Sequence, residues 1–242
     1  MTLLSTVQNV CRKIGKTPPS VVVTSTDATI LELFVMANET GDAFAREHDF
    51  PELYKQCSFS ATSTVYQGQL INSSAIVTDG DYMRMVPDTF WNTSLNSKLV
   101  LATPAEWSQL QAMASTPYPA RWTIIQGGLY IGPVTGPTSP NSCSFYYYSN
   151  KWVQSASGTY QTAYQLDTDV AVVPEKLIYL DLVWRWKQAK GLQYAEDMKT
   201  AELAIDQYTG AVGGAKKLLL GGGSNMYNPV VGGPTIPDGN WG

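Results

Sequence analysis

The stretch PEKLIYLDLVWRWKQAKGL, residues 174–192, decides the fold. Its apolar side chains recur at intervals of three and four residues, which predicts an amphipathic helix from about Pro174 to about Gly191. The periodic positions are Leu177, Leu180, Val183, Trp184 and Lys187. The next periodic stretch, residues 195–209, follows after a short connection, and two helices so closely joined predict a helical hairpin.

The N-terminal end of the chain has the same helical periodicity. Residues 2–14 predict one helix, which Gly15 ends. A second helix is expected to begin near Asp27, whose side chain can cap it, and to continue through Phe44. A short helical turn is expected at residues 51–54.

Between these helical ends, residues 57–165 are rich in Thr, Tyr, Val and Ser, with Gly or Pro every eight to twelve residues. This pattern predicts short antiparallel strands. The clearest hairpin is residues 124–131, where two apolar arms flank a predicted Gly127–Gly128 turn. Residues 142–148 predict another strand. One short helix interrupts the strands, because Thr103 and Glu106 form a capping-box pattern.

The predicted fold class is therefore α+β: a helical bundle from the N- and C-terminal helices, with a β-rich insertion and an extended C-terminal arm. Residues 221–242 are rich in Gly, Pro and Asn yet keep several large apolar side chains, as do segments that become ordered on a partner. The predicted divisions are residues 1–56 for the N-terminal helices, 57–170 for the β-rich insertion with one short helix, 171–215 for the C-terminal helical hairpin, and 216–242 for the arm.

Composition excludes several classes of protein. Charged residues make up only 15% of the chain and the net charge is −4. The longest basic run is Lys216–Lys217, which argues against tight, sequence-reading binding of nucleic acid. No window has the roughly 18 continuous apolar residues of a membrane span. The three cysteines are widely spaced, so we expect reduced, buried thiols in a protein assembled in a cytoplasm.

No catalytic, cofactor-binding or metal-binding residue is predicted. The single histidine, His48, is expected at a surface or interface, and one histidine with scattered cysteines does not make a zinc site. Two acidic pairs, Asp79 with Asp81 and Asp167 with Asp169, could bind calcium or serve a glycosidase, but turn chemistry explains them better. The glycine runs lack the pattern of a phosphate loop.

Three passages, taken in order, carry a resemblance to a known family. The first is Leu3–Ile14 with Thr26–Thr29, Ala37–Glu39 and Arg46–Leu53; the second is Val86–Asn92 with Thr103–Trp107; the third is Asp167–Asp169 leading into Pro174–Leu177 and Leu182–Leu192. Together they resemble the head-to-tail adaptor, or connector, proteins of tailed bacteriophages. The likeness covers roughly residues 1–215 and is one of pattern and order.

The resemblance implies a structural virion protein of the neck at the portal vertex, not an enzyme. Such adaptors form rings, typically dodecamers, that dock under the portal protein, extend the DNA channel and present a face to tail or nozzle proteins. Double-stranded DNA passes through the lumen without sequence-specific binding. Assembly is expected in the host cytoplasm.

Two sets of residues are predicted to make the contacts of such a ring. The candidate portal-docking residues of the C-terminal arm are Met226, Tyr227, Val230, Val231, Ile236 and Trp241. The candidate subunit-interface residues are Trp184, Arg185, Trp186, Lys187 and Lys190, since Trp and Arg are favoured anchors at interfaces. The other reading of this second set is an ordinary amphipathic helix with Trp184 inside and the cations outside.

Two alternatives remain from the sequence. A carbohydrate-binding or glycan-cleaving module is suggested by the aromatic β region, where Tyr146, Tyr147, Tyr148 and Trp152 could stack on sugars and replacement of Tyr147 or Trp152 would abolish binding. The other is a different structural protein of the virion, from the tail tube or decorating the capsid.

Overall fold

The structure is a computed structural model that describes residues 2–71, 76–112, 120–132 and 141–213. Within them the chain is a mixture of helices and several sheets, so the α+β prediction is confirmed. The helices are α1 (Leu3–Lys13), α2 (Ala28–Glu47), the short 3-10 helix η1 (Pro51–Leu53), α3 (Pro104–Ala112), α4 (Glu175–Ala189) and α5 (Ala195–Gly213). The predicted C-terminal arm lies outside the described residues.

The twelve strands of the described residues are short. They are β1 (Tyr54–Ala61), β2 (Tyr66–Gln69), β3 (Tyr82–Met85), β4 (Trp91–Asn92), β5 (Ser97–Lys98), β6 (Val100–Leu101), β7 (Arg121–Ile125), β8 (Gly128–Gly132), β9 (Asn141–Ser149), β10 (Val153–Gln154), β11 (Tyr160–Gln161) and β12 (Val170–Ala171).

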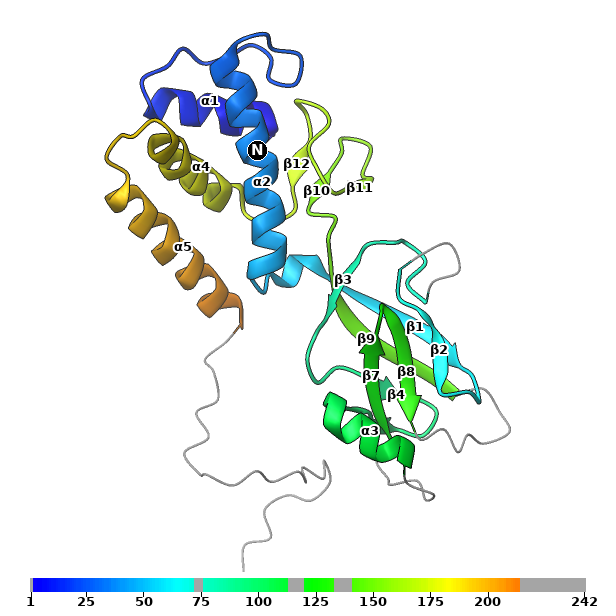
Figure 1. Cartoon of the computed structure of the whole chain (residues 1–242). Helices are drawn as coiled ribbons and strands as arrows, with labels where there is room; N and C mark the ends of the chain where they lie inside the picture. Colours follow the sequence, from blue (N-terminus) through cyan, green and yellow to red (C-terminus); the bar gives the residue numbers. More distant parts are fainter. Residues whose placement is uncertain (1, 72–75, 113–119, 133–140, 214–242) are drawn as a thin grey trace, which may run out of the picture.

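Helices from the two ends of the sequence pack together at one end of the molecule (Figure 1). Helix α4 contacts α1, α2 and α5, so it lies at the centre of this group. Its buried apolar side chains are Leu177, Ile178, Leu182, Val183 and Trp186. The apolar stripe therefore has a slightly different phase from the predicted one, because Leu180 and Trp184 are only half-buried.

The helix ends follow the predicted signals. Asp27 caps α2 by accepting hydrogen bonds from the backbone N–H groups of Thr29 and Ile30. Gly15, with φ of +74°, follows α1 where a left-handed residue is needed. Thr103 and Glu106 exchange the two hydrogen bonds of a capping box at the start of α3, as predicted.

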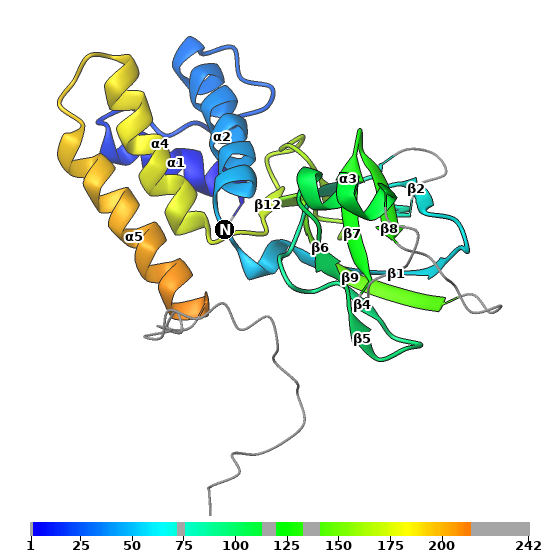
Figure 2. The ribbon, with the colours of Figure 1, turned by 60° about the horizontal axis from the view of Figure 1, so that its bottom comes forward.

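The strands form three sheets. A five-stranded sheet has the order β1-β9-β4-β5, with β3 also paired to β9, and a four-stranded sheet has the order β2-β8-β7-β6. These two sheets enclose a second apolar core that includes Phe90, Trp122, Leu129 and Phe145. Figure 2 shows them side by side, away from α5.

The third sheet, β11-β10-β12, belongs to the helical end of the molecule. Trp152, Val153 and Tyr164 lie in the same buried cluster as α1, α2 and α4. Trp152 is fully buried, and its ring lies over Gly41 of α2, where an added Cβ would come within 2.1 Å of it. The helical core is therefore completed by residues that follow β9.

The predicted hairpin at residues 124–131 is present, but its turn is displaced by one residue. Gln126 and Gly127 make the turn, with φ of 52° and 76°. Two consecutive positive φ angles are typical of a two-residue hairpin turn that follows the twist of its strands. Gly128 instead begins β8, paired with Ile125, and a Cβ there would come within 2.8 Å of the Tyr66 ring.

Candidate functional site

The predicted subunit-interface residues of α4 divide between the core and the surface. Trp186 is buried in the helical core. Trp184 is half-buried, and its indole N–H donates a hydrogen bond of 2.7 Å to Asp181. The alternative reading that put Trp184 inside the helix face was therefore wrong about which tryptophan is buried.

The three cations of this set pair with carboxylates of the same chain. Arg185 forms an ion pair with Asp181, one turn before it on α4. Lys187 reaches Asp197 of α5 at 2.5 Å, and Lys190 reaches Glu32 of α2 at 2.7 Å. The two lysine contacts hold α4 to α5 and α2, and all three cations have a carboxylate partner within their own chain.

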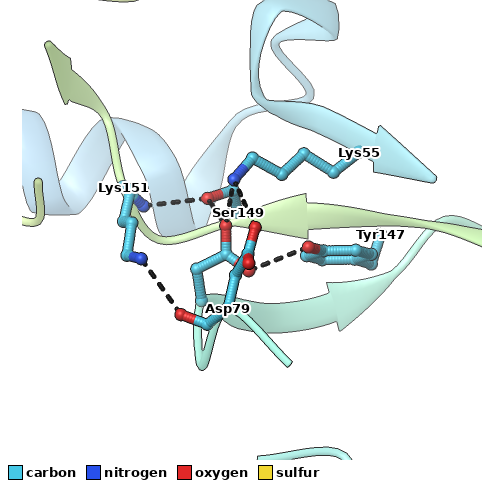
Figure 3. A network of polar contacts seen from close by, with 6 residues as sticks. Lys55, Asp79, Tyr147, Ser149 and Lys151 are labelled. Carbon is cyan, nitrogen blue, oxygen red and sulfur yellow. Dashed lines mark hydrogen bonds and ion pairs between the residues drawn. The ribbon is translucent and has the colours of Figure 1, made fainter. Parts of the chain in front are cut away.

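A second polar cluster lies inside the five-stranded sheet, around the fully buried carboxylate of Asp81 (Figure 3). Its oxygens accept hydrogen bonds from the Lys55 ammonium at 2.5 Å, the Tyr147 hydroxyl at 2.8 Å and the Ser149 hydroxyl at 2.8 Å. Lys55 also approaches the exposed Asp79 carboxylate at 3.5 Å. The cluster joins β1 and β9 to the turn before β3.

The pKa of Asp81 reflects two opposing causes. Burial alone would raise it, but the hydrogen bonds from Lys55, Ser149 and Tyr147 and the charge of Lys55 outweigh burial and lower it. The pKa of Tyr147 is raised, mainly by burial and then by its hydrogen bond to Asp81. An ionised Asp81 held by three donors therefore cross-links β1 and β9 to the turn before β3.

A third cluster joins the helical end to the strands. The Arg84 guanidinium lies over the Tyr148 ring at 3.7 Å from its centroid and pairs with Asp49 at 2.8 Å. It also donates to the backbone carbonyl of His48, just after α2. The Tyr148 and Tyr54 hydroxyls are 3.0 Å apart. These contacts fix the start of β1 against the end of α2.

The acidic pairs singled out in the sequence act within the fold. Asp167 accepts the backbone N–H groups of Val22 and Val23, and Asp169 accepts those of Gln165 and Leu166. Asp79 and Asp81 share Lys55, as described above. Among the described residues no group of three His, Cys, Asp or Glu side chains could hold a metal ion.

Sequence reasoning singled out Asp81 only as a turn residue and gave no signal for its partners. Lys55 and Ser149 lie in strands far from it along the chain, and neither belongs to a recognisable motif. Nor did any sequence pattern indicate that Arg84 would join the strands to the end of α2. Such clusters are found only once the strands are paired.

Three of the four residues proposed to stack on sugars, Tyr147, Tyr148 and Trp152, are buried. Tyr147 and Trp152 are both buried, and their rings belong to the two apolar cores. The neighbouring Tyr146 is exposed on the outer face of β9. The glycan-binding alternative, as stated for Tyr147 and Trp152, is therefore wrong about its contact residues.

The other residues singled out in the sequence have plain roles. His48 is half-buried and packs edge-on against the rings of Phe44 and Phe50. The three cysteines are all buried, as predicted, with no disulfide among them. Over the described ranges, the helices are too short or too polar to cross a bilayer. The predicted docking residues Met226, Tyr227, Val230, Val231, Ile236 and Trp241 lie outside the described residues.

Two comparisons with known proteins bear on the whole chain. The sequence model of a family described as "SU10 adaptor protein" matches residues 1–232. No curated protein matches the chain. The family match extends from the first helix through both cores and into the C-terminal segment, so it covers the architecture as a whole instead of one motif.

Proposed function

Because the chain belongs to the SU10 adaptor protein family, we propose that it is a ring-forming head-to-tail adaptor that docks under the phage portal and extends the DNA channel. Membership itself makes the chain a phage structural protein, a component of the virion that associates with other capsid or tail proteins. The single observation that carries the proposal is the extent of the match, residues 1–232.

The ring is proposed to contain twelve copies in the neck of the virion, assembled in the host cytoplasm. Its lumen passes double-stranded DNA without reading the sequence. The net charge of −4 and the lack of a basic run longer than two residues support this part of the proposal, because clustered Lys and Arg would hold the phosphates of the passing DNA.

The C-terminal residues 216–242 are proposed to dock on the portal. Their composition supports this role: they combine Gly, Pro and Asn with large apolar side chains, including Tyr227 and Trp241. Ordering a segment on a partner costs conformational entropy, but many identical arms in one ring gain from multivalency.

The exposed part of α4 is proposed as one lateral contact between copies. Trp184 supports this proposal, since it is only half-buried, lies beside Arg185, and tryptophan is favoured at interfaces. The cations Arg185, Lys187 and Lys190 support it less, because each already has a carboxylate partner in its own chain.

Native mass spectrometry and electron microscopy of the chain mixed with purified portal protein test the proposal. We expect complexes with twelve copies of the chain per portal ring. A chain that stays monomeric in the presence of portal would contradict the proposed function. Deleting residues 221–242 is expected to weaken portal binding while the circular dichroism of the core stays unchanged; unchanged binding would contradict the role of the arm.

A further inference from the structure

Charged residues are missing from a large part of the strand region. Residues 56–78 and 122–150 contain no Asp, Glu, Lys, Arg or His. These stretches hold β2, β8, β9 and nearly all of β1 and β7. Charge is depleted at the centre of protein interfaces, whereas exposed surfaces of soluble proteins are normally rich in it.

Exposed apolar side chains lie on and beside the four-stranded sheet of this uncharged region. We call them the hairpin patch: Val65, Tyr66, Ile71, Ile124 and Ile125, each between 37% and 45% exposed. They lie on or beside β2 and β7, the two neighbours of β8. The Leu70 N–H donates to the Gly127 carbonyl at 2.9 Å, which brings Ile71 close to the hairpin turn. Figure 1 places these strands at the end of the molecule away from α1 and α4.

Strand β1 adds an open edge to the same region. It forms a continuous ladder of eight residue pairs with β9 on one side, and among the described residues no strand pairs with its other side. Exposed edges are normally protected by proline, a bulge or an outward lysine. The sequence of β1 has no proline and its ladder no bulge, and its one charge, Lys55, is directed to the buried Asp81.

The absence of charge restricts what can cover this surface. Charged side chains of a partner would lose their bound water on contact with this surface, and no opposite charge here would compensate for that loss. An identical uncharged surface loses no such hydration. If the proposed ring exists, on which this step rests, it places further copies of the same chain alongside. Three cations at the C-terminal end of α4, Arg185, Lys187 and Lys190, are already paired with carboxylates of their own chain.

We infer that the hairpin patch and the β1 edge together form a second surface, besides the one proposed on α4, at which adjacent copies of this chain meet in the assembled virion. The contact is apolar and hydroxyl-rich and contains no ion pair. Salt screens ion pairs but not the burial of apolar surface, so this contact does not weaken as the ionic strength rises.

Site-specific photo-crosslinking in purified phage particles tests the inference directly. A benzophenone-bearing residue is placed at Ile125 or Ile71, which are 40% and 45% exposed, and the adducts are identified by mass spectrometry. We expect adducts between two copies of the chain at both positions. The matched control positions are Val35 on α2 and Leu203 on α5, which are 53% and 50% exposed and lie outside the inferred surface.

The crosslinking results that would overturn the inference differ from those that would contradict the proposed function. Adducts at Ile125 and Ile71 with another virion protein would overturn the inference and make this surface a docking site for that protein. No adduct at either position, or stronger self-adducts at Val35 and Leu203, would overturn it as well. Absence of the unsubstituted chain from purified particles would instead contradict the proposed function, so the two failures are distinguishable.

Charge substitution supplies a second measurement. Ile125→Lys places an uncompensated charge in the contact and is expected to lower the occupancy of the chain in particles by roughly tenfold or more. Val35→Lys is the matched control and is expected to leave occupancy unchanged. Equal occupancy for the two variants, both with the melting temperature of the unsubstituted chain, would overturn the inference.

Discussion

Gly41 and Trp152 make the contact that joins α2 to the segment after β9, and replacing Gly41 with alanine tests it. A Cβ at position 41 would lie 2.1–2.3 Å from three atoms of the Trp152 ring. Carbon atoms normally approach to about 3.5–4.0 Å, so the overlap is more than 1 Å. The ring is fully buried and cannot turn into solvent.

The expected loss of stability follows from two opposing effects. Inserting a methyl group into a packed core typically costs about 1–3 kcal/mol, and a contact this short lies at the upper end of that range. Replacing a mid-helix glycine with alanine gains about 0.5–1 kcal/mol in helix propensity. We therefore expect Gly41→Ala to lower the free energy of unfolding by about 2 kcal/mol. For a chain of this size the melting temperature falls by about 4–8 °C.

Thermal denaturation followed by circular dichroism measures the effect, with Gly210→Ala as the matched control. Gly210 lies in α5, where a Cβ would meet nothing within 4 Å. This substitution keeps the gain in propensity without the overlap, so the melting temperature is expected to rise by about 1–4 °C.

The two substitutions must therefore differ in sign. If Gly41→Ala raises the melting temperature as Gly210→Ala does, the close packing of Trp152 on α2 is refuted. In a Trp152→Phe background the smaller ring leaves room for the methyl group, so the loss caused by Gly41→Ala is expected to shrink. If Gly41→Ala lowers the stability of the Trp152→Phe chain by as much as it lowers that of the original chain, the contact between residues 41 and 152 is refuted.

Three further perturbations follow from the strand region. Asp81→Asn removes the negative charge that pairs with the Lys55 ammonium and replaces one of the two acceptor oxygens with an amide donor, and is expected to lower the free energy of unfolding by about 3 kcal/mol in urea denaturation. The pKa of Asp81 is lowered by folding from its ordinary value of 3.8, so the stability it contributes is present above that pH and is lost as pH falls toward its lower folded-state pKa. Gly127→Ala places a side chain at φ of 76° and is expected to cost about 1–2 kcal/mol in the same assay. Cys57 and Cys143, whose pKa values burial raises to about 11, are expected to resist thiol reagents at pH 8 until the chain unfolds.

A different result would contradict each of these three predictions. Asp79→Asn is the control for Asp81, since its carboxylate is exposed and 3.5 Å from Lys55; equal losses from both would contradict the role of the buried carboxylate. A Gly127→Ala chain as stable as the original would place the turn elsewhere. Modification of Cys57 or Cys143 in the folded chain, as fast as in urea, would contradict their burial.

Local features were predictable from the sequence because they depend on neighbours along the chain. The apolar spacing and the capping residue Asp27 located α2, and the pair Thr103 and Glu106 located α3, since caps and helical stripes use side chains within four residues of one another. The turn was predicted at Gly127–Gly128 but lies one residue earlier, at Gln126–Gly127. Two adjacent glycines both tolerate a positive φ, so the sequence did not indicate that Gln126 would take the first turn position.

The candidate sites were less predictable, because their contacts join distant segments. Periodicity placed Lys187 and Lys190 on one predicted helix, but it did not locate their carboxylate partners, Asp197 of α5 and Glu32 of α2. It also could not distinguish the half-buried Trp184 from the buried Trp186, since that depends on how α4 is rotated against its neighbours.

The sequence by itself determined the α+β character, the ends of the helices, the shortage of charge and the resemblance to phage adaptors. Only the tertiary structure decided that Trp152 closes the helical core over Gly41 and that Asp81 is a buried cross-link. It also decided that the uncharged strands expose the apolar side chains of the hairpin patch and, among the described residues, leave one edge of β1 unpaired. The physical reason is that helix formation and capping act over a few residues, whereas packing and strand pairing bring together side chains about a hundred positions apart.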